Sequence, residues 1–89
     1  MNKITLANGA EYDCDWAGAS QGYLNICLPG GMTEAQYTRI FGDPEATCRI
    51  EYRREGEPEE RMTIFEGYTT LTGVQMDSWY GGEAIVSLK

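Results

Sequence analysis

The chain contains no histidine, and its two lysines, Lys3 and Lys89, stand at its two ends. Because common pairs of nucleophile and general base need a histidine or a nearby lysine, this composition argues against most hydrolytic mechanisms. The three cysteines, Cys14, Cys27 and Cys48, form no CxxC pair and stand in apolar or alternating runs, where a thiol behaves as a small buried hydrophobic group. We therefore predict a protein that is not an enzyme, has no metal or other cofactor and keeps its cysteines reduced.

Long apolar runs are also missing, and the first residues lack the regions of a signal peptide. No segment reaches the length that a membrane span requires. Fourteen acidic residues against seven basic ones give a net charge of -7 and a pI near 4.4, which argues against direct binding to nucleic acid or to an anionic membrane. The sequence thus predicts a cytoplasmic protein whose charge keeps it soluble.

One segment resembles the start of a calcium-binding loop, because Asp13 and Asp15 stand at its first and third positions and Gly18 at its sixth. The fifth and twelfth positions are Ala17 and Leu24, where such a loop needs oxygen ligands. We therefore predict no calcium site, and a solvated strand face in its place.

The first part of the chain, residues 3–16, has the pattern of a β-hairpin around the Asn-Gly pair at 8–9. A loop of three residues places the apolar side chains on one face, with Gly9 in the left-handed conformation, and a shift by one residue would turn every side chain over. The pairs in this register are Leu6 with Tyr12 and Ile4 with Cys14. The inner face then consists of Ile4, Leu6, Tyr12, Cys14 and Trp16.

Residues 17–22 are small and polar, which predicts a loop, and residues 23–28 predict a third strand that ends at Pro29. A helix over about 33–42 follows. Thr33 and Gln36 have the spacing of a capping box. The apolar positions Tyr37, Ile40 and Phe41 form one stripe, and Gly42 is the expected C-terminal cap.

The segment from Thr47 to Tyr68 predicts a long two-stranded arm. Its outgoing strand alternates, with Cys48, Ile50 and Tyr52 on one face. Two further strands close the chain over residues 68–77 and 83–88, and the second has Ala84, Val86 and Leu88 on its inner face.

The predicted fold is a single small α+β domain over residues 1–89, mostly antiparallel β. It has about seven short strands in a roll or partial barrel, with one short helix after the third strand.

Two features of the sequence predict an interaction surface. Aromatic side chains in loops are enriched at interfaces, and the predicted turn before the last strand holds such a pair. The arm concentrates charges, which cross-strand ion pairs and protection of an edge strand would also explain. The candidate contact residues are Trp79, Tyr80, Arg53, Arg54, Arg61, Glu57, Glu59 and Glu60.

Three stretches, Phe41–Thr47, Ile50–Tyr52 and Gly67–Leu71, resemble a pattern in small uncharacterised proteins encoded by phages and prophages of Gram-positive gut bacteria. The resemblance covers roughly the C-terminal half of the chain and includes no catalytic signature. It implies a virion-associated, assembly or host-interaction protein, which could be carried within a phage particle.

The sequence therefore predicts a non-enzymatic interaction or structural module that binds a protein partner or a second copy of itself. An alternative is an acidic mimic of nucleic acid that inhibits a host nucleic-acid-binding protein. Its basis is the acidic stripe of Glu11, Asp13 and Asp15 together with the acids of residues 57–60.

Overall fold

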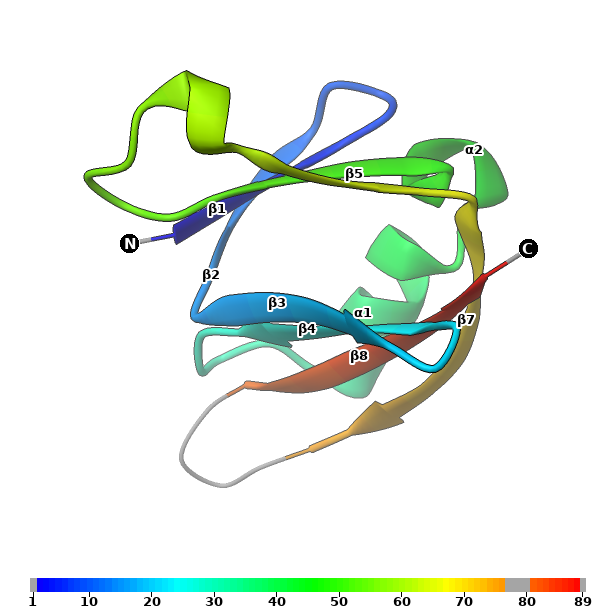
Figure 1. Ribbon diagram of the computed structural model, residues 1–89. Coiled ribbons are helices and arrows are strands. Elements are labelled where there is room, and N and C mark those ends of the chain that lie inside the picture. Colours follow the sequence, from blue (N-terminus) through cyan, green and yellow to red (C-terminus); the bar gives the residue numbers. More distant parts are fainter. Residues whose placement is uncertain (1, 77–80, 89) are drawn as a thin grey trace.

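The structure is a computed structural model and describes residues 2–76 and 81–88 (Figure 1). The described part contains eight antiparallel strands in two four-stranded sheets, with two short α-helices and one 3₁₀ turn. This confirms a mostly antiparallel α+β domain. The predicted number of seven strands was wrong, and the main helix follows the fourth strand rather than the third.

Sheet A has the strand order β2-β1-β5-β6 and sheet B the order β3-β4-β8-β7. The strands of sheet A are β1 (Asn2–Leu6), β2 (Glu11–Cys14), β5 (Arg49–Arg53) and β6 (Thr63–Glu66). The strands of sheet B are β3 (Trp16–Ser20), β4 (Tyr23–Leu28), β7 (Tyr68–Gln75) and β8 (Gly82–Leu88). The two sheets lie one above the other in Figure 1, so their outer faces point in opposite directions.

Two bent edge strands join the sheets on opposite sides of the molecule (Figure 1). At one corner β2 continues into β3 through Asp15, whose backbone N–H donates a 2.7 Å hydrogen bond to the carbonyl of Cys27. At the other corner β6 continues into β7 through Gly67, which has a φ of +85° and donates to the carbonyl of Cys48 at 2.9 Å. Strands that switch sheets at a bend are the usual corners of two packed sheets. The edges of sheet A therefore continue as the edges of sheet B.

The main helix, α1 (Glu34–Phe41), has the predicted caps. Thr33 accepts a hydrogen bond from the Gln36 backbone at 3.3 Å, and the Gln36 side chain accepts one from the Thr33 backbone at 2.8 Å. Gly42 is the C-terminal cap, and its N–H donates to Thr38. The amphipathic stripe is confirmed, because Tyr37 and Phe41 are fully buried.

A second helix, α2 (Pro44–Thr47), was not predicted and replaces the expected start of the arm. Asp43 caps it by accepting a hydrogen bond from the Glu45 backbone at 3.0 Å, and Pro44 takes the first helical position, where its missing N–H costs nothing. This turn leaves Cys48 exposed at its C-terminal end, so the prediction that Cys48 faces inward was wrong.

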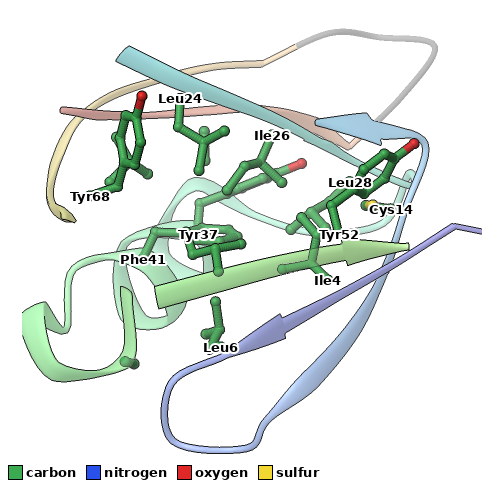
Figure 2. Packing of buried hydrophobic residues seen from close by; sticks show 14 residues of the cluster. Ile4, Leu6, Cys14, Leu24, Ile26, Leu28, Tyr37, Phe41, Tyr52 and Tyr68 are labelled. Atoms are coloured by element: carbon green, nitrogen blue, oxygen red, sulfur yellow. The ribbon is translucent and has the colours of Figure 1, made fainter. Parts of the chain in front are cut away.

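The core lies between the two sheets and receives side chains from both sheets and from α1 (Figure 2). The helix α1 packs mainly against β7, β8 and α2. The Tyr37 hydroxyl donates a buried 2.6 Å hydrogen bond to the Gly82 carbonyl and so ties the helix to the start of β8. The fully buried hydrophobic residues are Ile4, Leu24, Ile26, Leu28, Tyr37, Phe41, Ile50, Ala84 and Val86.

The predicted faces of the first hairpin are correct over β1 and β2, but its pairing is displaced by two residues. Ile4 pairs with Tyr12 and not with Cys14, because the turn begins one residue earlier than predicted. Gly9 has the predicted positive φ, and the Asn8 side chain accepts a 2.9 Å hydrogen bond from the Ala10 backbone and so stabilises this turn. A displacement by two residues keeps each side chain on its face.

The segment predicted as a loop over residues 17–22 is mostly the strand β3, with a turn at Gln21 and Gly22. Its small residues have little strand propensity, but the pairing of all five residues of β3 with β4 outweighs that local preference. The bend at Asp15 also reverses the alternation of the chain, so Trp16 points outward and is 44% exposed. The prediction that Trp16 belongs to the inner face was therefore wrong.

The predicted arm is a hairpin of β5 and β6, but it does not stand alone. Strand β5 lies inside sheet A between β1 and β6, with Ile50 opposite both Leu6 and Phe65. The edge strand is β6 and not the charged β5. At the end of the chain Ala84 and Val86 are buried as predicted, whereas Leu88 is 53% exposed, contrary to prediction, where β8 leaves the core.

Candidate functional site

The charged residues predicted as a contact surface lie where β5 and β6 connect. Arg54, Glu57 and Arg61 line one shallow hollow of about 260 Å³ together with Tyr52 and Thr63. A neighbouring hollow of about 410 Å³ is lined by Arg53, Arg54 and Glu57 and by residues of β1 and β2. Glu60 is exposed and Glu59 belongs to the 3₁₀ turn η1 (Glu59–Arg61). The structure thus gathers opposite charges here.

The other predicted contact residues, Trp79 and Tyr80, lie outside the described residues.

The outer face of sheet A carries alternating charges that pair with each other. Arg49 hydrogen-bonds to Glu66 across the β5–β6 pair and lies 3.1 Å from Glu51, and Lys3 lies 4.0 Å from Glu11. These side chains are between 27% and 64% exposed, so each pair contributes only about 0–1 kcal/mol to stability. The outward charged residues of sheet A are Lys3, Glu11, Asp13, Arg49, Glu51, Arg53 and Glu66.

The outer face of sheet B has a different composition, and we name its outward positions the sheet B face. The register aligns these positions in three rows that cross the four strands in the order β3, β4, β8 and β7. The first row is Trp16, Cys27, Glu83 and Gln75; the second is Gly18, Asn25, Ile85 and Gly73; the third is Ser20, Tyr23, Ser87 and Thr70. In these rows Glu83 is the one charged residue.

Two large aromatic side chains border the sheet B face. Trp16 in the first row is 44% exposed and Tyr23 in the third row is 46% exposed. The middle row between them has a glycine at each end, Gly18 and Gly73. The face therefore has an uncharged, low-lying centre with an aromatic residue on either side.

The glycines of the middle row are not required by the fold of the described chain. A Cβ atom at Gly18 or Gly73 would meet no heavy atom within 4 Å, and neither residue has a positive φ. In contrast, Gly42, Gly81 and Gly82 have no room for a Cβ atom. A glycine inside a strand weakens it and often marks a bulge or a place where another molecule approaches closely. Gly73 lies beside a register shift, but the pairing around Gly18 is regular.

A pocket of about 520 Å³ opens at the Trp16 end of the sheet B face, and we name it the Trp16 pocket. It consists of the complete first row of the face and three neighbouring residues from the ends of β2, β7 and β8. Its described lining residues are Asp15, Trp16, Cys27, Gln75, Met76, Gly82 and Glu83.

The floor of the Trp16 pocket is held by the core. The carbonyl of Gly82 accepts the hydrogen bond of the buried Tyr37 hydroxyl. Gly82 has a φ of +142°, and a Cβ atom there would lie 2.8 Å from the Gln75 carbonyl and 2.9 Å from the Met76 sulfur. A side chain at this position would therefore both strain the backbone and fill the pocket.

Buried titratable groups beneath the site are held in their neutral forms. Burial, with a smaller contribution from the charge of Asp15, raises the pKa of the Cys14 thiol from 9.0 to about 12. Burial likewise raises the pKa of the Tyr37 hydroxyl to about 12. A thiol with such a pKa is a poor nucleophile at neutral pH, because the thiolate is the reactive form.

Within residues 2–76 and 81–88 we find no group of three or more Cys, Asp or Glu side chains placed to hold a metal ion. Cys14, Cys27 and Cys48 form no disulfide. None of the described helices has the length and hydrophobicity that crossing a membrane requires.

Comparisons of the chain with protein-family models, with curated proteins and with solved structures give no significant match.

The Trp16 pocket and the sheet B face were not predicted from the sequence. Two signals were present. Trp16 follows a strand of outward acids, and Gly18 stands between small residues in a segment that was interpreted as a loop. Only the pairing of β3 with β4 places these residues in one sheet with β7 and β8.

Proposed function

We propose that this domain is a non-enzymatic interaction module that binds another protein chain on the sheet B face. The observation that carries the proposal is the contrast in charge. In a chain with a net charge of -7, Glu83 is the one charged residue among the described positions of the sheet B face. Depletion of charge and enrichment of aromatic residues are typical of the centre of a protein interface.

The shape of the face supports the same proposal. Trp16 and Tyr23 supply rigid aromatic surface with few rotatable bonds, and such residues dominate the binding energy of many interfaces. The glycines of the middle row allow a partner to approach the backbone of sheet B closely, which explains Gly18 better than any contact within the described chain does. The resemblance to phage-encoded proteins suggests a partner in a virion, in its assembly or in the host.

The alternative function, an acidic mimic of nucleic acid, has weaker support. The predicted acidic stripe is divided, because Glu11 and Asp13 lie on the outer face of sheet A whereas Asp15 lines the Trp16 pocket. Lys3, Arg49 and Arg53 interrupt the acids of sheet A. A mimic of phosphate backbone needs an uninterrupted row of negative charge.

Site-specific photo-crosslinking tests the proposed face. A photoreactive amino acid is placed at Tyr23 on sheet B or at Thr5 on sheet A, and the protein is irradiated in the cells from which the gene comes. We expect an adduct of defined mass from position 23 and not from position 5. An adduct of twice the protein's mass identifies a second copy as the partner, and a different mass identifies another protein.

A variant supplies the control for that experiment. Trp16→Ser removes an outward side chain, so the fold should be retained and the adduct should decrease about tenfold or more, as for a hot-spot residue. The circular dichroism spectrum checks the fold. The proposal is wrong if neither position gives an adduct, if both give the same adduct, or if Trp16→Ser leaves the adduct unchanged in a folded protein.

A further inference from the structure

We infer that the Trp16 pocket binds a basic side chain, lysine or arginine, of the protein that docks on the sheet B face; this inference rests on the function proposed above. The pocket combines three properties that such a side chain requires: negative charge, an aromatic surface and apolar walls. Each comes from a different part of the chain.

The negative charge comes from two carboxylates. Asp15 and Glu83 both line the pocket, and no lysine or arginine is among its described lining residues. Among the described residues neither carboxylate forms an ion pair or a side-chain hydrogen bond. Both carboxylates are therefore available to a cation that enters the pocket, and each would attract it.

The aromatic and apolar surfaces come from Trp16 and Met76, which are 44% and 49% exposed. A lysine or arginine side chain has an apolar stem that packs on such surfaces while its charged end remains near water or a carboxylate. Tryptophan is the aromatic side chain that attracts a cation most strongly. The polarizable sulfur of methionine adapts to the shape of the stem.

The size and rigidity of the pocket also fit a side chain of a docked protein. A volume of about 520 Å³ is within the range of binding pockets, and the Tyr37 hydrogen bond fixes its floor. The pocket is continuous with the first row of the sheet B face. A chain lying across the face could therefore insert a side chain here.

A metal ion is a less suitable occupant. The described residues contain no group of three metal-ligating side chains at this place, and a tryptophan and a thioether contribute nothing that a hard divalent cation prefers. An organic cation with an apolar stem uses the carboxylates, the indole and the thioether together.

The test is an NMR titration of the isotopically labelled protein with blocked single amino acids. The probes are N-acetyl-lysine N-methylamide, the corresponding arginine compound and the norleucine compound, which has the apolar stem of lysine without its charge. We expect saturable shifts of the Trp16 indole N–H and of the Glu83 and Gln75 backbone amides with the two cationic probes. Binding should weaken as salt is added, and the norleucine compound should bind several-fold more weakly.

A pair of matched variants distinguishes the effect of the two pocket carboxylates on binding from the effect of the net charge of the protein. The double variant Asp15→Asn with Glu83→Gln removes both pocket carboxylates, and we expect about tenfold weaker binding of the lysine probe. The control variant Glu11→Gln with Glu51→Gln makes the same change in net charge on the outer face of sheet A and should leave binding unchanged. Trp79→Phe assigns the indole signal of Trp16.

Four results would overturn the inference: no saturable shift, equal binding of the norleucine compound, equal weakening by the two double variants, or tighter competing binding of Ca²⁺ or Mg²⁺. These results leave the proposed function intact if the crosslink from Tyr23 is still formed. Conversely, binding of the lysine probe without any crosslink from the sheet B face would disprove the docking function. The pocket would then be a site for a small organic cation.

Discussion

The two outer faces of this molecule are built on the same plan and differ in what they carry. Each belongs to a four-stranded antiparallel sheet whose inner side chains enter one common core. The outer face of sheet A bears charges of both signs in ion pairs, whereas the sheet B face bears Glu83, two exposed aromatics and glycines. Since the core is shared, stability does not explain the difference. We propose that the difference reflects the docking of a partner chain on the sheet B face.

Solubility and the register of strand pairing are sufficient to explain the charges of sheet A. Exposed ion pairs add little stability, but opposite charges across neighbouring strands favour one pairing over its alternatives. Sheet B has no such pattern, and its register is fixed by buried side chains such as Leu24 and Ile26. Under the proposed function, a small acidic domain confines most of its outward charge to sheet A and keeps sheet B for contact with a partner.

The largest expected effect is that a substitution in the common core destabilises both sheets together. Phe41→Ala removes a fully buried ring from α1, and we expect the free energy of unfolding to fall by about 3–5 kcal/mol. Chemical denaturation monitored by the amide signals of β5 and β8 should show one transition for the two sheets. Arg39→Ala, an exposed change on the same helix, should alter stability by about 0.5 kcal/mol or less. Separate transitions for β5 and β8 would contradict a shared core.

A smaller expected effect is a loss of stability at alkaline pH, because two buried groups near the two sheets can ionise there. The pKa values of Cys14 on β2 and Tyr37 on α1 are raised from 9.0 and 10.0 to about 12. Below about pH 8 both groups are almost fully protonated in the folded and unfolded states. Above it the unfolded chain loses protons that the folded chain keeps, so stability decreases as pH rises toward 12. The slope should reach about 1.4 kcal/mol per pH unit for each group.

Denaturation curves at pH 7, 9 and 10 check this prediction, and Cys14→Ala is its control. Near pH 9 the thiol is the first of the two groups to titrate in the unfolded chain, so the variant should lose most of the early slope. The attribution to Cys14 is wrong if the wild type and the variant lose stability equally over this range.

The smallest expected effect is the most informative about the two faces. Gly18→Thr places a β-branched residue in a strand position with free space around it, so we expect a gain in stability of about 0.5–1 kcal/mol. The same methyl and hydroxyl groups would raise the low centre of the sheet B face, and the crosslink from Tyr23 should decrease.

The matched opposite change is Thr5→Gly on the outer face of sheet A, which should lower stability by a similar amount and leave the crosslink unchanged. If Gly18→Thr raises the free energy of unfolding but lowers the yield of the crosslink, the result supports a role of Gly18 in contact with the partner. If Gly18→Thr stabilises the protein without affecting the crosslink, the middle row is not part of the interface.

Local patterns in the sequence predicted the elements that local interactions stabilise. The capping box of Thr33 and Gln36, the stripe of Tyr37 and Phe41, and the alternation of Ile50 and Tyr52 were all confirmed. Capping bonds act within one helical turn, and the alternation of a strand follows from its backbone geometry alone. The sequence also determined an acidic chain without histidine.

The tertiary structure decided everything that depends on which strands become neighbours. Pairing with β4 made a strand of the small residues around Gly18, and the bend at Asp15 turned Trp16 from the expected inner face to the surface. The Trp16 pocket combines residues near positions 15, 27, 75 and 83, which no short-range pattern connects. Strand pairing joins distant segments through buried contacts and backbone hydrogen bonds, so the candidate site exists only in the folded chain.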